Sequence, residues 1–250
     1  MRKYLVGAAA VTAMLAAPGL ASADSGSVGV SVGNFSADGG GEADFWTLNG
    51  AYTHDLDNGW TMQFDGEHAS LDGGGSTNLG SGYGAVALGM RNDQYAFYGW
   101  VGLSDAFVSA TQLGIGGQWY LGQMTFNGSL GYADADNAYN VTDIHVDGTY
   151  YFNDNLGLGA EYTTTSFDSS GGSDLDIDTW GINGVWRFTG SPFQVNAGYR
   201  WSDTDFGDLD TWQLGFSYHF GTDSARGESQ SGSSWNGANT LGRETLLGVL

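Results

Sequence analysis

The chain has 250 residues, a formal net charge of −21, no cysteine, and only seven lysine and arginine residues against 28 aspartate and glutamate residues. This balance excludes a nucleic-acid binder, because phosphates need basic partners. The lack of cysteine excludes disulfides, thiol nucleophiles and thiolate metal sites.

The first 23 residues have the layout of a targeting segment. Arg2 and Lys3 precede an apolar stretch from Leu5 to Leu15, and small residues follow at 21–23. This order predicts a cleavable secretory signal peptide over 1–23, since the apolar stretch is too short to span a bilayer. Without it, five basic residues remain against 28 acids, and no lysine is left.

From residue 24 onward, segments of about ten residues alternate apolar with polar side chains, as in 60–65 and 180–188. This period of two predicts half-buried β-strands. The remainder has no run of 18 apolar residues, so strands must make any membrane crossing. Only a closed barrel satisfies every backbone group in lipid.

Twelve such segments follow one another, and an even strand number is typical of bacterial outer-membrane barrels. We therefore predict an all-β fold, a closed antiparallel up-and-down transmembrane β-barrel of about twelve strands. The predicted strands span residues 27–35, 44–54, 60–70, 83–91, 95–104, 110–121, 124–133, 141–152, 156–166, 179–189, 193–202 and 211–220.

The predicted connections fall into two classes. Tight turns at 55–59, 92–94, 122–123, 153–155 and 190–192 alternate with connections that are mostly longer and rich in glycine, serine and aspartate. Such barrels have short periplasmic turns and longer outer loops. Aromatic residues near the strand ends predict two girdles at the lipid interfaces. A secreted soluble β-sandwich or jelly roll is the structural alternative.

Two segments resemble a known family. Tyr151-Phe-Asn-Asp-Asn-Leu-Gly-Leu158 is similar to the periplasmic hairpins of small Gram-negative outer-membrane porins, and Gln213-Leu-Gly-Phe-Ser-Tyr-His-Phe220 resembles the assembly signal of their last strand. The resemblance implies a bacterial outer-membrane location, contacts with outer-membrane lipid and lipopolysaccharide, and recognition of Gln213–Phe220 by the barrel assembly machinery.

The chain departs from that family after Phe220, which would usually be the last residue, whereas thirty residues follow here. These residues are rich in glycine and serine and end in a short apolar run, so we predict a flexible periplasmic tail over 221–250. A plug, or a peptide that docks on a partner, is the alternative. The predicted domains are the signal peptide 1–23, the transmembrane barrel 24–220 and this tail.

Function is expected in the lumen, toward which the polar face of each strand points. Many inward residues are small, which predicts a narrow aqueous pore. Inward acids outnumber arginines, which predicts a preference for cations. The candidate pore-lining residues are Asp65, Glu67, Asp143, His145, Asp147, Glu161, Arg187 and Arg200.

One pair of these residues carries like charges. The register across the turn at 153–155 places Asp147 opposite Glu161 on the inner face, and directly opposed like charges destabilise a strand pair. Arg187 on a diagonal to Glu161, a shared proton or a passing cation would each compensate. The pair is therefore either part of a satisfied salt-bridge network or a selectivity site.

The predicted outer loops contain fourteen acids and no lysine or arginine. Asp174, Asp176 and Asp178 share one face of an extended segment, and clustered oxygens bind hard cations, so they are a candidate Ca²⁺ or Mg²⁺ site that bridges loops or lipopolysaccharide. A solvated acidic rim that attracts cations is the alternative. No other cofactor is expected.

These patterns predict an outer-membrane porin for the passive diffusion of small hydrophilic solutes, with a preference for cations. No motif for nucleophilic catalysis is present, so no enzyme activity is expected. A non-conducting structural or adhesive barrel with acidic surface loops is the alternative. Crowding of the inner face would favour that alternative, and a continuous polar path would favour the porin. The oligomeric state is left open.

Overall fold

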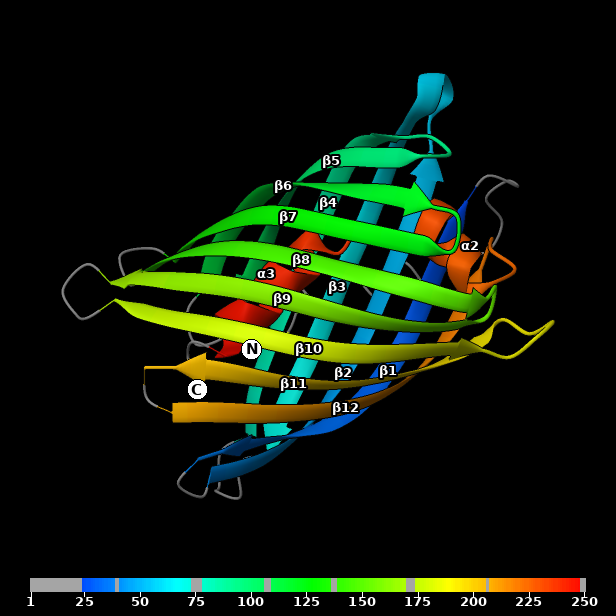
Figure 1. The fold of residues 1–250 in the computed structure, drawn as a ribbon. Helices are drawn as coiled ribbons and strands as arrows, with labels where there is room; N and C mark the ends of the chain where they lie inside the picture. Colours follow the sequence, from blue (N-terminus) through cyan, green and yellow to red (C-terminus); the bar gives the residue numbers. More distant parts are fainter. Residues whose placement is uncertain are drawn as a thin grey trace.

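The computed structural model describes residues 24–38, 41–72, 78–105, 109–135, 139–169, 174–205 and 207–247. Its strands form one closed antiparallel barrel in which each pairs with its neighbours in sequence and the first pairs with the last, so the predicted fold class is confirmed (Figure 1). The strands are β1 (Ser25–Ala37), β2 (Gly41–Asp55), β3 (Trp60–Asp72), β4 (Asn78–Arg91), β5 (Tyr95–Asp105), β6 (Ser109–Leu121), β7 (Met124–Ala135), β8 (Tyr139–Asn153), β9 (Leu156–Ser169), β10 (Leu175–Arg187), β11 (Phe193–Thr204) and β12 (Gly207–Phe220).

Short connections gather at one end of the barrel, which we call the turn rim. They are residues 56–59, 92–94, 122–123, 154–155 and 188–192, close to the predicted tight turns. The β6–β7 turn has two residues, and Gly122 takes a φ of 62°, a conformation that favours glycine. The predicted signal peptide lies outside the described residues. Within them, no helix is long and apolar enough to cross a membrane.

At the opposite end, which we call the acidic rim, the strands run further than predicted. β4 begins at Asn78 rather than 83, and β10 begins at Leu175 rather than 179. Much of what the sequence presented as acidic loop is therefore paired strand. The ladder continues because backbone pairing does not depend on the side chains that the strand carries.

The outer face of the barrel carries an apolar band. Val101 and Ile115 are each 63% exposed, and every strand from β1 to β12 contributes at least one exposed large hydrophobic residue. Soluble monomers rarely expose such a continuous apolar surface, so this band faces lipid. Exposed tryptophan and tyrosine residues flank it, among them Trp46, Trp180 and Trp212 toward the acidic rim and Trp60, Trp119 and Tyr218 toward the turn rim.

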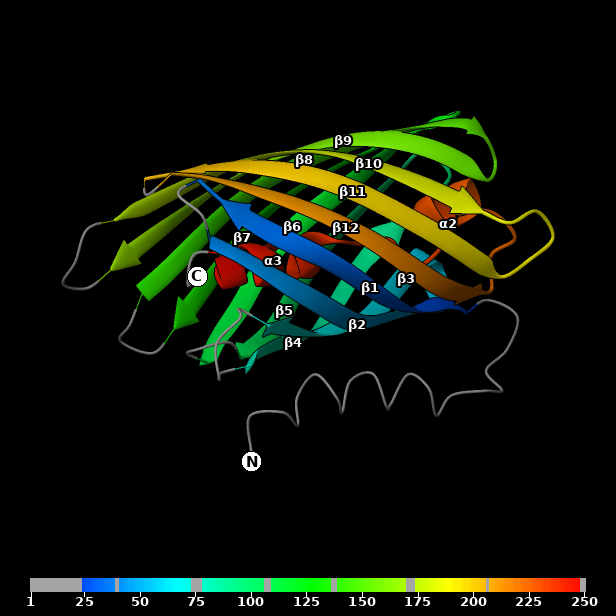
Figure 2. The same cartoon turned by 90° about the horizontal axis from the view of Figure 1, so that it is seen from below.

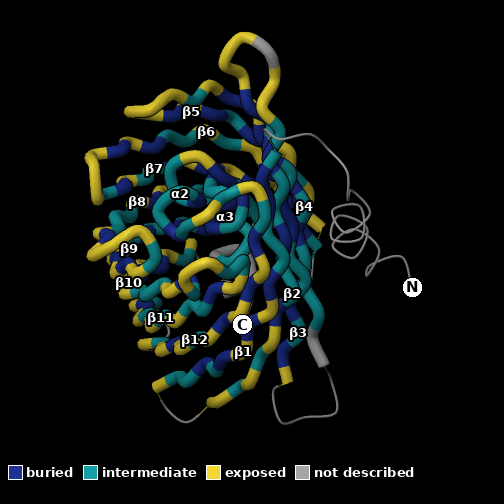
Figure 3. Tube along the Cα trace, turned by 90° about the vertical axis from the view of Figure 1, so that its right-hand side faces the viewer, coloured by how far each residue is buried: buried dark blue, intermediate teal, exposed yellow. Residues whose placement is uncertain are grey.

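The inner face changes character along the barrel axis. Within the band it is largely polar, and Gln112, Thr125 and Thr163 are fully buried there. An apolar patch interrupts it on β4 to β6, where Tyr83, Tyr98 and Trp100 are buried. Near the acidic rim it becomes apolar, and buried inward side chains pack into a group that we call the rim cluster. The rim cluster consists of Phe35, Leu71, Ala110, Ala133, Ala135, Val141, Phe167, Ile177 and Leu241. Figure 3 shows how buried and exposed residues alternate along the strands.

The flexible tail predicted over 221–250 is wrong for its described part. Residues after β12 form two helices, α2 (Ala225–Ser231) and α3 (Gly237–Leu247). α2 lies at the turn rim, and α3 lies inside the barrel against β3 to β8 (Figures 1, 2 and 3). The composition did not indicate this, because the few apolar residues that hold the segment, Trp235, Ala238 and Leu241, pack on side chains of strands distant in the sequence.

Candidate functional site: the lumen and its occupant

The structure places all eight candidate pore-lining residues on the inner wall, at inward positions of β3, β8, β9, β10 and β11. Asp143, His145 and Arg187 are at most 1% exposed, and Asp65 is 6% exposed. Arg91 also faces inward, at the turn-rim end of β4. The wall therefore carries five acids and three arginines between the two rims. That these residues line a conducting path stays a prediction.

Asp147 and Glu161 pair across β8 and β9, as the register predicted. Phe152 is bulged, so Asn153 rather than Phe152 faces Leu156 without changing this pairing. Asp147 accepts hydrogen bonds from Asn127 at 2.6 Å and contacts Nε2 of His145 at 2.9 Å.

Each of the two carboxylates has its own partners. Glu161 accepts a hydrogen bond from Nε of Arg200, and Nη1 of Arg243 lies 3.8 Å from it. The expected partner Arg187 instead lies at the turn rim, where Nε donates to Gln194 at 3.3 Å. The opposed like charges are thus compensated by a salt-bridge network. One of its arginines, Arg243, comes from α3, within the segment that the sequence predicted as a flexible tail.

The C-terminal segment, residues 222–247, is anchored by Trp235. Its ring stacks on Tyr98 with centroids 4.7 Å apart, and the guanidinium of Arg91 lies 5.0 Å from the ring centroid. Its backbone makes two hydrogen bonds with Gln63: the amide N–H donates to Oε1 at 3.1 Å, and the carbonyl accepts from Nε2 at 2.7 Å. Trp235 is 2% exposed.

Polar side chains hold the rest of the segment to the wall. Asn236 donates to Asp147 at 3.1 Å, and Asn239 donates to the hydroxyl of Tyr83 at 2.8 Å. Further toward the acidic rim, Leu241 is fully buried in the rim cluster. The segment therefore crosses most of the length of the lumen.

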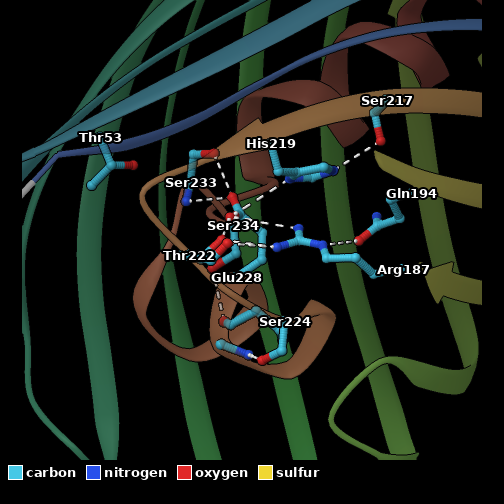
Figure 4. Close-up of polar contacts among 12 residues, drawn as sticks. Thr53, Arg187, Gln194, Ser217, His219, Thr222, Ser224, Glu228, Ser233 and Ser234 are labelled. Atoms are coloured by element: carbon cyan, nitrogen blue, oxygen red, sulfur yellow. Dashed lines mark hydrogen bonds and ion pairs between the residues drawn. The ribbon is translucent and has the colours of Figure 1, made fainter. Parts of the chain in front are cut away.

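Glu228 of α2 is the centre of a polar group at the turn rim (Figure 4). Its carboxylate accepts hydrogen bonds from the hydroxyls of Thr222 and Ser233, and Nδ1 of His219 lies 3.6 Å away. Nη2 of Arg187 lies 3.9 Å away.

Two opposing effects set the protonation of this carboxyl. Burial acts to raise the pKa of Glu228, but hydrogen bonding and charge from His219, with the donors of Thr222 and Ser233, lower it to about 2. The carboxylate is therefore charged at neutral pH and fixes the start of the segment.

Two hollows that the described residues line lie in the lumen. A cavity of about 170 Å³ lies between α3 and the wall, lined among others by Glu67, Arg200 and Arg243. A polar hollow of about 540 Å³ opens at the turn rim and is lined by Thr61 and Arg91. Along β3, Gln63 lies between these two hollows and holds the backbone of Trp235. Trp235 therefore marks the layer that separates them.

The candidate metal residues do not form a site of three ligands. Asp174, Asp176 and Asp178 are exposed on the outward side of the chain at β10, and Asp178 accepts a hydrogen bond from Tyr162 at 2.8 Å. Within the described residues, no group of three or more histidine, aspartate or glutamate side chains is placed to hold a metal ion. The acids lie on the outer face of strand ends, as a charged collar around the barrel.

No family model matches the sequence, and no curated protein matches it. Among solved structures, the chain is similar to an outer-membrane channel from Pseudomonas putida F1, with a TM-score of 0.60 and 13% identity over 82% of this chain and 99% of that one. By fold, it is a small porin-like barrel. The NanC porin (TM-score 0.59, 14% identity, 76% and 98% covered) and the KdgM porin with oligogalacturonate (0.52, 9%, 76% and 98%) are also similar. At these identities the likeness is one of fold.

Proposed function

We propose that the chain is an outer-membrane channel through which small hydrophilic solutes diffuse, with a preference for cations. The observation that carries the proposal is the polarity of the inner wall within the apolar band. A barrel with no passage can be filled with apolar side chains, whereas this wall keeps glutamine, threonine and charged residues at inward positions outside the apolar patch on β4 to β6. The similar folds of solved porins and channels support the same reading.

Fixed charge supports the cation preference. Asp65, Glu67, Asp143, Asp147 and Glu161 face the lumen against Arg91, Arg187 and Arg200, and the outer collar of aspartates surrounds the acidic rim. Rings of carboxylates favour cations in channels, and a field of one sign raises the local concentration of the opposite ion.

A non-conducting structural or adhesive barrel is the second candidate, and one observation favours it. The C-terminal segment occupies much of the lumen, and Trp235 lies between the two hollows described above. The two candidates differ in one property: whether ions pass through the folded protein.

The test is the current through the refolded protein in planar bilayers, with the reversal potential under a KCl gradient. We expect discrete steps and a reversal potential on the cation side. Asp143→Asn removes one fully buried lumen charge, which accepts a hydrogen bond from Thr165 at 3.3 Å, and should reduce the cation preference. Asp176→Asn removes the same charge from the outer face and is the matched control.

Three results would count against the proposal. A correctly folded barrel that never conducts would favour the structural candidate. Anion preference, or equal effects of the two substitutions, would contradict the role of the lumen charges. Asp147→Asn is less suitable, because Asp147 also holds Asn236.

A further inference from the structure

We propose that the lumen wall of β3 to β8 is a reversible docking surface for the C-terminal segment, residues 222–247, and that its part from Trp235 onward is a built-in plug that leaves the lumen when the channel conducts. The inference rests on the proposed function, because a plug has a purpose only in a channel. Four features of the described residues support it: the anchors, the helix, the wall beneath it and the tether.

The anchors are few and lie far apart along the segment. Trp235 and Leu241 are its large buried apolar side chains in the described residues. Elsewhere the segment is held by side-chain hydrogen bonds such as Asn239 to Tyr83. Such bonds replace bonds to water and contribute little net free energy. The apolar contacts of the docked segment are those of Trp235 and Ala238 on β4 to β6 and of Leu241 in the rim cluster.

The helix is shaped for the wall rather than for stability on its own. A Cβ at Gly237 would lie 2.6 Å from the ring of Trp100, and a Cβ at Gly242 would lie 2.9 Å from the ring of Tyr83. The two glycines therefore allow the helix to approach the wall closely, although glycine weakens a helix. An isolated helix of eleven residues is marginal in water, so α3 depends on docking.

The wall beneath α3 combines an apolar patch on β4 to β6 with buried polar groups that lack partners among the described residues. Gln112 is fully buried, yet neither atom of its side-chain amide has a hydrogen-bond partner among the described residues. The same holds for Oδ1 of Asp65 and the hydroxyl of Ser129. Polar groups at a permanent interface are usually paired or replaced by apolar ones, whereas groups in a channel bond to water once the lumen opens.

The chain from the end of β12 through α2, which we call the tether, keeps the segment attached to the barrel when α3 undocks. It begins directly after β12 at the turn rim, where Arg226 of α2 forms an ion pair with Asp154 at 2.8 Å and Gln230 donates to the carbonyl of Gly122 at 3.1 Å. α3 can therefore withdraw toward the turn rim while the chain stays attached. The attachment keeps the effective concentration of the segment high, which favours closure without tight contacts.

A reversible covalent lock tests this inference in the full chain. A Cβ built on Gly131 would lie 3.4 Å from Cβ of Leu241, at the edge of the range for a disulfide. The chain contains no other cysteine, so Gly131→Cys with Leu241→Cys can form only this bond within one chain. Mass spectrometry establishes that it forms, and failure to form under oxidising conditions would contradict the docked position of α3.

The expected result is a current that depends on the state of the disulfide. The oxidised protein should be silent, and a reductant added to the same bilayer should restore openings. Each single-cysteine variant is the control for the reductant itself.

A variant that weakens the docking of α3 should increase the current instead of abolishing it. Gly237→Ala places a methyl group against Trp100 and should raise the open fraction about tenfold, because overpacking opposes docking. Gly41→Ala is the matched control, since its Cβ would meet nothing nearer than Ala37 at 3.9 Å.

The outcomes separate the plug from the channel. An oxidised protein that conducts as well as the reduced one would overturn the plug and leave the channel proposal intact. Equal open fractions for Gly237→Ala and Gly41→Ala would also overturn the plug. Silence of every variant in every state would overturn both proposals together.

Discussion

The same strands carry opposite polarities in the apolar band and at the acidic rim. In the band, β10 presents Ile182 outward and Asn183 inward; nearer the rim, it presents Asp178 outward and buried Ile177 inward. The alternation of inward and outward side chains is unbroken along β10, so only the surroundings of the strand differ between the two regions. Lipid selects an apolar outer face in the band, whereas water outside the rim selects acids there and leaves the interior for an apolar cluster.

The two regions of the interior therefore differ in what stabilises them. The rim cluster resembles the core of a soluble β-protein and holds the strand ends together without lipid. The band contains a second apolar cluster, in which Trp235 and Ala238 of the C-terminal segment pack on Tyr83, Tyr98 and Trp100. The rest of its inner wall is polar, so its apolar packing depends on the docked segment. The most stable part of the interior should therefore be the rim, and the most easily opened part should be the lumen beneath α3.

The largest expected effect is on the rim cluster. Phe167→Ala, at a position 5% exposed, should lower the free energy of unfolding by about 3–5 kcal/mol, because it leaves a cavity as well as losing apolar burial. Phe97→Ala on the lipid face, 64% exposed, should cost about 2 kcal/mol, since lipid fills the space. Denaturant unfolding in lipid vesicles measures both. Equal costs would contradict the packed cluster.

The second largest difference in folding free energy between the two regions is expected when a charge is introduced on the outer face. Ile115→Arg lies midway along β6 in the band and should cost about 2–4 kcal/mol of folding free energy in vesicles. Asp176→Arg at the rim should cost less than about 1 kcal/mol, because that side chain is in water. A similar cost at both positions would place the rim in lipid.

Acid should loosen the start of the C-terminal segment. The pKa of Glu228 is about 2 when the segment is docked, below its ordinary value of 4.5, so its stabilisation is present above pH 4.5 and is lost as the pH falls toward 2. The full loss is about 3 kcal/mol of docking free energy. Pepsin cleavage of the segment should therefore increase over this range. Glu228→Gln should be cleaved readily already at pH 4.5, and an unchanged pH profile in that variant would contradict the role of this carboxylate.

The smallest expected effect is on the outer collar. Asp174→Asn or Asp178→Asn should change the free energy of unfolding by less than about 0.5 kcal/mol, because both side chains are exposed. Thermal unfolding with and without Ca²⁺ measures this. A marked Ca²⁺-dependent stabilisation that the substitutions remove would show that the collar binds cations after all.

The barrel was predictable because each strand carries its own signal. Alternation in segments such as 180–188, turn residues such as Gly122 and aromatic residues at strand ends fixed the strand number, the turn rim and the Asp147–Glu161 pairing. The acidic strand ends were not predicted because apolar residues point inward and acidic residues point outward there, which is the reverse of the arrangement in the band. Phe35, Leu71 and Ile177 occupy the parity of the polar lumen residues, and a search for this reversal would have found them.

The docking of residues 222–247 inside the lumen could not be predicted from local sequence patterns. Glycine, serine and asparagine in 221–250 indicate a flexible chain in water, and their order in the lumen depends on partners on distant strands. Arg243 is therefore a partner of Glu161 that only the fold reveals. Trp235 was the one signal available, since a lone tryptophan in a polar segment often marks a docking anchor.

The most direct test of the account is access of a water-soluble thiol reagent to Gln112→Cys in the folded, full-length protein. Gln112 is fully buried beneath α3, and the chain offers no competing thiol. We expect a cationic methanethiosulfonate to label this cysteine in intact vesicles, faster than an anionic one, while Leu113→Cys on the lipid face stays unlabelled. Labelling of Gln112→Cys only after the barrel unfolds would contradict an aqueous lumen that its own C-terminal segment opens and closes.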